Sequence, residues 1–305
     1  MKTRGNMEDI YDSLKKEKIE YVKDILLSSL SSFKVGGRAE CVVYPKNEAE
    51  ISKTVALAKQ NNVRFEIIGN GSNVFFSDNG YNGIIICTKK MTSVFTDKDT
   101  ITAQCGARLS SLAVAAREHS LTGLEFAHGI PGTVGGAIAM NAGAFAGEMS
   151  DVVVSSLALN TKSGECVYLE KEKHNFGYRK SIYTENKDLV CVLVNMQLHT
   201  GDKSDIEAKM KQNATTRREK QPLDMPSCGS YFKRPDGYIA AKLIDELGLK
   251  GLSVGGAMVS EKHAGFIVNT GNATATDILA LEEKIKKSVM EHYGISLERE
   301  VKYVE

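Results

Sequence analysis

Residues 128–145 restrict the fold more than any other stretch of the chain. Their sequence, HGIPGTVGGAIAMNAGAF, has five glycines among eighteen residues and no Asp, Glu, Lys or Arg. Glycine is a poor former of both helices and strands, so we expect an irregular backbone that something approaches closely. One interpretation is a loop buried between two lobes. The other interpretation, favoured by the length of this glycine-rich loop, is a binding site for a flat, mostly apolar cofactor ring whose edge atoms need backbone amide donors.

Length and composition place the chain among ordinary soluble globular proteins of two or three domains. Of its 305 residues, 42% are hydrophobic and 25% are charged. The 39 Lys and Arg residues nearly balance 38 Asp and Glu, which gives no support for binding nucleic acid or an acidic membrane. The sequence has no run of 18 apolar residues and no apolar segment at its start, so we expect a cytoplasmic protein that does not span a membrane.

The cysteines and histidines favour neither disulfides nor a metal site. No two of the six cysteines form a CxxC pair and most lie in apolar runs, so we expect reduced thiols in the core. The six histidines lie far apart in the sequence, and none belongs to an HExxH pair. We therefore predict that the chain binds no metal.

The spacing of apolar residues predicts an α+β protein. Helical spacing favours an opening helix within residues 8–27. Strand 41–45, helix 47–60 with a capping box, and strand 65–68 form a predicted βαβ unit with parallel strands. Further strands are predicted near 83–88, 93–95, 100–104, 152–160, 166–169, 190–199, 266–269 and 295–304, and further helices near 108–119, 203–219, 238–247 and 274–292.

The loop Gly69-Asn-Gly-Ser-Asn73 follows the predicted strand 65–68. Glycine permits a positive φ and a close approach of backbone amides to an anion, which suits a diphosphate. The loop is not a Walker loop, because no Gly-Lys-Ser/Thr follows, and Val74 stands where a dinucleotide fingerprint has its third glycine. A tight turn without a ligand is equally consistent with this sequence.

A local basic patch precedes a serine within an apolar turn. Residues 209–220 contain five cations and one acid, which suits either a phosphate site or a solvated helix face. Ser230 follows in CGSYFK without the GxSxG elbow of a hydrolase, so it is interpreted as a proton donor or as a plain turn serine. The neighbouring Cys228 is interpreted as an inert thiol.

Two charged residues lie among apolar or aromatic neighbours. Arg179 lies in NFGYRKS, and Glu300 lies in the closing segment LEREV. Strand alternation places Glu298 and Glu300 on the same face. Two interpretations stay open for Glu300, a solvent-facing side chain and a buried carboxylate that needs a cation or a reaction to serve.

Seven motifs that occur in order along nearly the whole chain resemble those of one family, the UDP-N-acetylenolpyruvoylglucosamine reductases (MurB). They are SSFKVGGRAE, IIGNGSNVFF, GLEFAHGIPGTVGGAIAMNAGAF, FGYRKSIY, KQPLDMPSCGSYFKRP, LIDELGLKGLSVGGAMVSEKHAGFIVN and LEREV. The chain is similar to the short-form (type II) subtype, because the strand ending at His199 passes directly into the next predicted helix. His263, Arg234 and Phe145 stand where the long form has glutamine, asparagine and tyrosine around its substrate.

The resemblance implies an α+β architecture with an FAD-binding fold of the vanillyl-alcohol-oxidase (PCMH) type. Its two α+β lobes would be residues 1–90, with the N-terminal helix, and 91–205. A third α+β lobe, 206–292, would bind substrate, and a C-terminal strand, 293–305, would return to the active site. The resemblance also implies non-covalent FAD, NADPH as reductant, the small-molecule substrate UDP-GlcNAc enolpyruvate, and a monomer.

The resemblance further assigns residues to each role. NADPH would reduce the flavin, and the flavin N5 would give hydride to the enolpyruvyl group. Arg179 and Glu300 would stabilise the enolate, and Ser230 would protonate the carbanionic centre. The implied substrate-binding residues are Tyr178, Arg217, Lys220, Lys233 and His263. The implied cofactor-binding residues are Gly69, Asn70, Gly71, Ser72, Asn73, Gly129, Ile130, Pro131, Gly132, Thr133, Gly135, Gly136, Asn141 and Gly143.

Two other function classes compete with this interpretation. A relative in the same FAD fold that oxidises a small alcohol or sugar with oxygen would need no basic patch for UDP. A nucleotide-sugar binding or regulatory protein without redox activity would rest on the GNGSN loop and the basic helix alone, and would be colourless.

Overall fold

The computed structural model describes residues 7–305 and divides the chain into two compact units, each assembled from segments far apart in the sequence. Unit 1 comprises the described residues up to Lys23 together with Cys41–Asn70 and Gly83–Thr215. Unit 2 comprises Asp24–Glu40, Gly71–Asn82 and Thr216–Glu305. Each unit has a hydrophobic core of its own.

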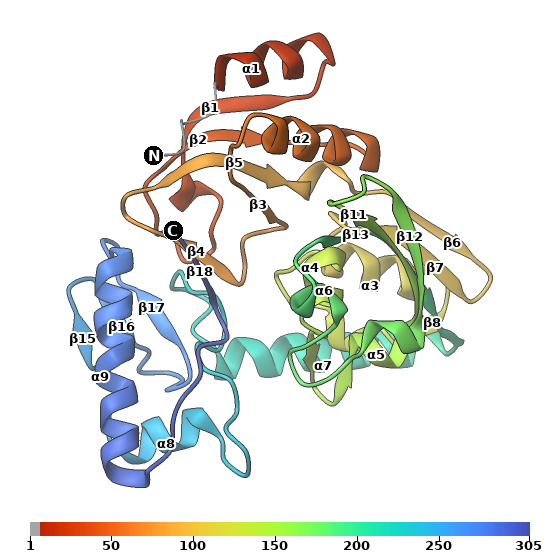
Figure 1. Cartoon of the computed structure of the whole chain (residues 1–305). Coiled ribbons are helices and arrows are strands. Elements are labelled where there is room, and N and C mark those ends of the chain that lie inside the picture. The colour runs from red at the N-terminus through yellow and green to blue at the C-terminus, as the bar shows by residue number, and fades with distance from the viewer. Residues whose placement is uncertain (1–6) are drawn as a thin grey trace. The chain divides into compact units, whose positions relative to one another are not determined.

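Helices and strands are mixed along the described chain, as the apolar spacing predicts (Figure 1). The helices are α1 (Met7–Lys16), α2 (Glu48–Gln60), α3 (Leu109–Glu118), α4 (Val134–Ala139), α5 (Met149–Val152), α6 (Ile182–Glu185), α7 (Lys203–Lys220), α8 (Ala240–Glu246) and α9 (Ala275–Tyr293). The strands are β1 (Tyr21–Leu26), β2 (Arg38–Val43), β3 (Phe65–Ile68), β4 (Val74–Phe76), β5 (Tyr81–Cys87), β6 (Val94–Asp97), β7 (Thr100–Gln104), β8 (Leu121–Thr122), β9 (Gly143–Ala144), β10 (Gly147–Glu148), β11 (Val153–Asn160), β12 (Cys166–Glu170), β13 (Leu189–Gln197), β14 (His199–Thr200), β15 (Ser253–Val254), β16 (Ala257–Val259), β17 (Ile267–Asn269) and β18 (Lys302–Val304).

The predicted opening helix across residues 8–27 is wrong in its second half. Helix α1 ends at Lys16, and strand β1 begins five residues later. Between them Lys18 takes a left-handed backbone with φ of 56°, and the Ile19 amide donates to the Leu14 carbonyl at 2.9 Å. The apolar residues of β1 fit strand pairing as well as helical spacing, and pairing in the sheet outweighs local propensity.

The predicted βαβ unit lies in a four-stranded sheet with the order β1-β2-β5-β3. Strands β2 and β3 therefore share a sheet, but β5 lies between them, and β3 pairs with β5 in parallel. Helix α2 is confirmed, and its N-cap works as predicted, because Asn47 Oδ1 accepts from the Glu50 amide at 3.0 Å. Strand β3 ends at Ile68, so the Gly69–Asn73 loop begins at its carboxyl end.

A five-stranded antiparallel sheet, with the order β12-β11-β13-β7-β6, forms the centre of the rest of unit 1. Helices α3, α4 and α6 pack on it, which leaves the glycine-rich stretch beside the sheet (Figure 1). All six cysteines are free, as predicted. Cys166 is nevertheless exposed, because β12 is an edge strand with mostly exposed residues, so its assignment to the core is wrong.

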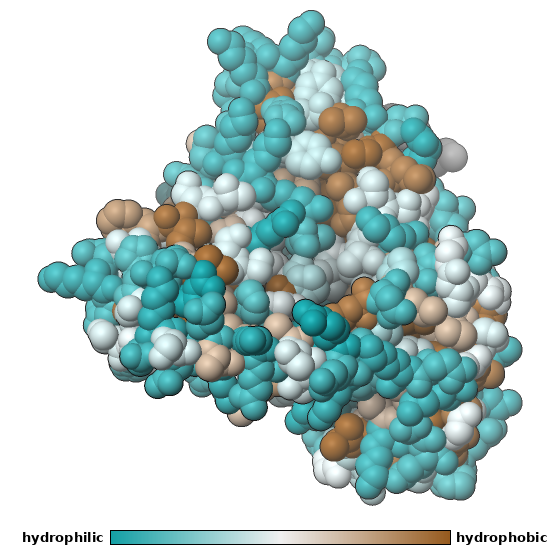
Figure 2. All heavy atoms as spheres, turned by 180° about the vertical axis from the view of Figure 1, so that it is seen from behind, coloured by the Kyte–Doolittle hydropathy of each residue, from teal (hydrophilic) through white to brown (hydrophobic). Residues whose placement is uncertain are grey.

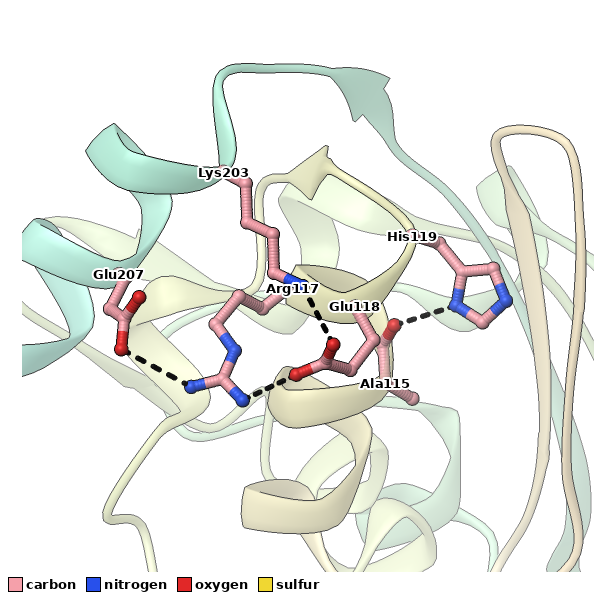
Figure 3. Close-up of polar contacts among 6 residues, drawn as sticks. All are labelled: Ala115, Arg117, Glu118, His119, Lys203 and Glu207. Carbon is pink, nitrogen blue, oxygen red and sulfur yellow. Dashed lines mark hydrogen bonds and ion pairs between the residues drawn. The ribbon is translucent and has the colours of Figure 1, made fainter.

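Ion pairs join the end of α3 to the first turn of α7 in unit 1 (Figure 3). Glu118 contacts Lys203 Nζ at 2.7 Å and Arg117 Nη2 at 2.5 Å, and Arg117 Nη1 lies 3.8 Å from Glu207. The two cations lower the pKa of the Glu118 carboxyl to about 2. Because Glu118, Lys203 and Glu207 are about half exposed, solvent screens these pairs, and we expect their contribution to stability to be small.

Unit 2 consists of a small antiparallel sheet, β15-β16-β17, against which α9 packs, and a parallel pair formed by β4 and β18 (Figure 1). Asp78, from the loop after β4, accepts hydrogen bonds from the Ala275 and Thr276 amides at 2.7 and 2.9 Å. A carboxylate at these amides is favourable because the N-terminal amides of a helix lack partners within the helix. This contact ties the start of α9 to the segment that follows the Gly69–Asn73 loop.

The predicted closing strand over residues 295–304 is shorter than expected. Only Lys302–Val304 forms a strand, and Arg299 makes a single antiparallel bridge with Phe232. The pairing changes partner along this segment, since Glu298 and Glu300 bond to residues 231–233 whereas β18 bonds to β4. A single regular strand is therefore replaced by two short pairings.

Hydrophilic residues prevail on the face that Figure 2 shows, and the hydrophobic residues there form small separate groups. Scattered apolar side chains of this kind are ordinary on folded proteins. Within residues 7–305, no helix is both long enough and apolar enough to cross a bilayer.

Candidate active site

The Gly69–Asn73 loop brings its backbone against neighbours at distances that admit no side chain. A Cβ on Gly71, where φ is +70°, would lie 1.7 Å from the Leu30 carbonyl oxygen. A Cβ on Gly69 would lie 2.2 Å from Thr133 Oγ1. Within residues 7–305 we find no acceptor for the amides of residues 70–72. Both glycines are thus required by close approach, and the amides remain available to an anion.

Thr133 carries an orphan hydroxyl next to this loop. Its Oγ1 is buried and has no hydrogen-bond partner among residues 7–305. A buried hydroxyl without a partner is costly, which fits a ligand with acceptor oxygens beside Gly69. Asn70 Nδ2 also donates to the Pro131 carbonyl at 2.6 Å. The structure thus brings Gly69 and Asn70 together with Pro131 and Thr133, and these groups fit the diphosphate of a dinucleotide cofactor.

The glycine-rich stretch is more regular than its composition predicts, because α4 occupies Val134–Ala139. Gly135 is required for packing, since its amide donates to the Cys105 carbonyl at 2.8 Å and a Cβ would lie 2.8 Å from Cys105 Cβ. Gly136 differs, because a Cβ there would meet only Thr133 Oγ1, at 3.6 Å. Gly135 therefore permits close packing, whereas Gly136 faces open space. Gly129 adds a left-handed turn with φ of +85° before Ile130, and the Gly132 carbonyl accepts from Leu109.

Asn141 is fully buried, and protein groups engage its amide. Its Oδ1 accepts from the Ser150 amide at 2.9 Å, and its Nδ2 donates to Glu148 Oε1 at 2.9 Å and to the Gly177 carbonyl at 3.2 Å. These contacts join the glycine-rich stretch to the segment that carries Arg179. Its predicted contact with the cofactor stays a prediction.

Arg179 lies in a tight turn of unit 1. Gly177 and Lys180 exchange two backbone hydrogen bonds of 3.1 and 3.2 Å, which leaves Tyr178 and Arg179 between them. Arg179 has a left-handed backbone with φ of 55°, a conformation that is uncommon outside glycine and clusters at functional sites. Its Nη2 donates to the Gly143 carbonyl at 3.4 Å, and its guanidinium lies 5.1 Å from the centre of the exposed Tyr178 ring.

Ser230 and Glu300 belong to unit 2, on adjacent segments. The Glu300 amide donates to the Tyr231 carbonyl at 2.9 Å, and the Glu300 carbonyl accepts from Asn73 Nδ2 at 3.2 Å. Ser230 is exposed, and its hydroxyl bonds to none of the residues 7–305. Glu300 is half-buried, whereas Glu298 is exposed and forms an ion pair with Lys233. Glu300 is thus bonded to Asn73 and to Tyr231, the chain neighbour of Ser230, whereas Arg179 belongs to the other unit.

The predicted substrate residues of unit 2 occupy two places. Arg217 and Lys220 are in the last turn of α7, where burial lowers the pKa of the Arg217 guanidinium. The Lys262 ammonium donates to the carbonyl of Arg218 at 2.7 Å and was not anticipated from the sequence. His263 is half-buried, and burial lowers its imidazole pKa.

Hydrogen bonds through Gly265 link His263 to the segment of Ser230. Its Nδ1 accepts from the Gly265 amide at 3.1 Å, and the Gly265 carbonyl accepts from the Tyr231 amide at 2.8 Å.

Cys228 is buried with its Sγ 3.4 Å from the Val74 carbonyl, and burial raises the pKa of its thiol, as an inert cysteine requires. Within residues 7–305, no three His, Cys, Asp or Glu side chains are grouped to hold a metal ion.

Comparison with known proteins accounts for both parts of the chain. The FAD binding domain matches residues 39–170, and the C-terminal domain of UDP-N-acetylenolpyruvoylglucosamine reductase matches residues 221–304. The UDP-N-acetylenolpyruvoylglucosamine reductase of Clostridium novyi is 44% identical over 94% of this chain and 93% of its own length. That of Caldicellulosiruptor bescii is 46% identical over 95% of this chain and 93% of its own length.

A solved structure agrees with these relatives. The UDP-N-acetylenolpyruvylglucosamine reductase (MurB) of Thermus caldophilus has a TM-score of 0.78 and 32% identity, covering 94% of this chain and 99% of that one. The α+β chain accordingly has the FAD-binding fold of the vanillyl-alcohol-oxidase (PCMH) type. With this agreement over nearly its full length, the chain belongs to the UDP-N-acetylenolpyruvoylglucosamine reductases, a family of FAD-containing oxidoreductases.

Proposed function

We propose that the chain reduces UDP-GlcNAc enolpyruvate to UDP-N-acetylmuramate with NADPH, a step in the synthesis of peptidoglycan precursors. The observation that carries this proposal is the 44–46% identity to reductases of that name over nearly the whole chain, with both the FAD binding and the C-terminal domain matched. The available amides of residues 70–72 and the orphan Thr133 hydroxyl support it, because they fit a diphosphate.

The residues that would hold FAD are those of the two glycine loops. The loop Gly69–Asn73 and the Thr133 hydroxyl would bind the diphosphate, and the stretch from Gly129 to Gly143 would lie along the ring and ribityl chain. When bound, FAD accepts a hydride from NADPH and supplies it to the enolpyruvyl group.

Arg179 and Glu300 would stabilise the negative charge that develops on the substrate carboxylate and its adjacent carbon. A guanidinium gives two parallel donors in the plane of a carboxylate, so it suits an enolate well. The turn that carries Arg179 is held by Asn141, which reduces the reorganisation that the reaction needs. Glu300, if protonated, would orient the same carboxylate.

Ser230 would deliver the proton that completes the lactyl ether. Its hydroxyl is exposed and bonds to no described residue, so it is available to a substrate. Gly229, with φ of +79°, sets the backbone direction immediately before it, and the following Tyr231 amide is fixed to Gly265. A serine is a weak acid in water. A neighbouring donor or a bound water therefore has to activate its hydroxyl for proton transfer.

The remaining substrate contacts stay proposals. Arg217 and Lys220 would meet the diphosphate and sugar side of the substrate, with Tyr178, Lys233 and His263 as further contacts. The four-segment division of the chain, a monomeric state and a cytoplasmic location also remain predictions.

An anaerobic visible spectrum tests the proposed function. A yellow protein should bleach when NADPH is added, and its colour should return when UDP-GlcNAc enolpyruvate follows. Recovery of colour with oxygen but not with this substrate would contradict the proposal and favour an oxidase. A protein that stays colourless after incubation with FAD would contradict the cofactor assignment itself.

A further inference from the structure

A buried carboxylate lies beside the segments that carry Ser230 and Glu300. Glu282 is on α9 and is 3% exposed, and of the Asp, Glu, Lys and Arg residues within 7–305 it alone is buried. The other buried residues of α9 are apolar. An ionised carboxylate on the apolar face of a helix is costly unless partners replace its lost water.

Three side chains supply those partners. Glu282 Oε2 accepts hydrogen bonds from the Tyr231 hydroxyl at 2.7 Å and from Arg299 Nη1 at 3.2 Å. Glu282 Oε1 lies 2.5 Å from Lys286 Nζ. The Arg299 guanidinium also lies 5.9 Å from the centre of the Phe75 ring, which covers it with an aromatic face. Both carboxylate oxygens are therefore satisfied by protein groups.

Two of these partners are chain neighbours of the proposed catalytic residues. Tyr231 follows Ser230, and Arg299 precedes Glu300. The Glu300 amide donates to the Tyr231 carbonyl at 2.9 Å, so the backbones are bonded where the side chains converge. A single oxygen, Oε2 of Glu282, thus fixes one side chain from each segment.

Such a buried charge is a poor means of gaining stability. Replacing a buried ion pair with apolar residues of similar volume is often neutral or stabilising, whereas a charged network does restrict the arrangement of its partners. We propose that Glu282 is a positioning residue that holds Ser230 and Glu300 in register for protonation of the substrate. This inference rests on the proposed function of Ser230 and Glu300.

Two variants test the role of this network. Glu282→Gln removes the charge with little change in shape, and Tyr231→Phe removes the hydroxyl while keeping the buried ring. The control is Glu291→Gln on the same helix, because Glu291 is 66% exposed and pairs only loosely with Lys287 at 3.8 Å.

The expected result is a split between the two half-reactions, followed by anaerobic rapid mixing. Reoxidation by UDP-GlcNAc enolpyruvate should slow by about 10-fold or more in both test variants, because small displacements of reacting groups cost rate steeply. Reduction by NADPH should change by less than about 2-fold, since it does not use the proton donor. Equal slowing of both half-reactions, or no slowing, would overturn the proposal.

Hydrogen exchange supplies a readout that needs no substrate. The Glu300 amide, which donates to Tyr231, should exchange faster in Glu282→Gln and Tyr231→Phe than in the wild type and in Glu291→Gln. Unchanged exchange in both test variants would overturn the positioning role. If the wild-type flavin is not reoxidised by the substrate, the proposed function fails, and exchange still decides whether Glu282 fixes these segments. If Glu282→Gln does not fold, Tyr231→Phe alone decides.

Discussion

The two units hold their proposed catalytic residues by different means. In unit 1, Arg179 lies in a two-residue turn and itself carries the left-handed backbone, while Asn141 bonds to the Gly177 carbonyl at the base of that turn. In unit 2, Ser230 and Glu300 lie on segments joined by backbone hydrogen bonds and by the side chains that meet at Glu282. One residue lies at the tip of a turn, and the other two lie on a bonded pair of segments.

The length of the side chain explains this difference. An arginine reaches several ångströms from its backbone, and its charge acts over distance, so only the base of its turn has to be fixed. A serine hydroxyl stands one carbon from the backbone and has to meet the carbon it protonates within hydrogen-bond reach. We infer that the short proton donor requires the more firmly bonded backbone.

Removing the Arg179 charge should have the largest effect among the changes in unit 1. In Arg179→Gln, reoxidation of the reduced flavin by UDP-GlcNAc enolpyruvate should slow by about 100-fold or more, because a donor to the developing charge is lost. Reduction by NADPH should stay near normal in the same rapid-mixing experiment. The neighbouring cation Lys180, which pairs with Glu185 at 2.6 Å, gives the matched control Lys180→Gln. Similar losses in both variants would remove Arg179 from the proposed role.

Loosening the turn should have a smaller effect of the same kind. Asn141→Ala removes three buried hydrogen bonds, so we expect a loss of about 1–3 kcal/mol in stability by denaturant unfolding and about 10-fold slower reoxidation. Asn195→Ala serves as control, because Asn195 also uses its amide within unit 1, with Ser155 and Thr102. The control should lose stability without slowing reoxidation selectively. A selective slowing in Asn195→Ala would show that the turn has no special role.

Backbone strain gives a third comparison of the two regions. Arg179→Gly should be more stable than Arg179→Ala by about 1 kcal/mol, because glycine accepts a φ of 55° that alanine resists. Gly229→Ala should cost a similar amount in unit 2, since φ there is +79° and no atom lies within 4 Å of an added Cβ. Chemical denaturation of the three variants measures both differences. Equal stability of Arg179→Gly and Arg179→Ala would mean that the turn relaxes without its arginine.

The smallest expected effect depends on pH. Burial lowers the pKa of the His174 imidazole below its usual value of 6.5, and its Nε2 lies 2.6 Å from Ser156 Oγ. The unfolded chain therefore binds this proton more readily, so the neutral histidine stabilises the fold above pH 6.5 and that share is lost as pH falls through the lowered pKa. Melting temperatures between pH 7 and pH 5 should fall less steeply in His174→Gln than in the wild type. The exposed His199, as His199→Gln, serves as the control for replacing a histidine.

Local patterns in the sequence were enough to predict most of the elements. The capped helix α2, strand β3 and the positions of the longer strands in the second half of unit 1 follow from spacing and capping residues alone. The second half of the opening helix and the closing strand were predicted wrongly, because pairing with distant segments decided them. Local sequence patterns do not reveal these partners, because they lie far away in the sequence.

The loops and residues of the candidate site could be predicted from the sequence, but the contacts that hold them in place could not. Glycine loops mark close approaches, so Gly69 and Gly71 could be found from the sequence. Asn141 was expected at the cofactor, but its amide bonds to the turn of Arg179, a contact that spacing does not reveal. Glu282 did leave a signal, because it stands on the apolar side of a predicted helix between Leu281 and Ile285, where a charge is unexpected.

The most direct test of the account is the Ser230→Ala variant, followed separately through its two half-reactions. Bleaching of the flavin by NADPH should proceed at nearly the wild-type rate, whereas return of the colour with UDP-GlcNAc enolpyruvate should slow by about 100-fold or more, as expected when a general acid is removed. An equal loss in both half-reactions, or undiminished reoxidation, would contradict the proposal that the segment of unit 2 carrying Ser230 supplies the proton.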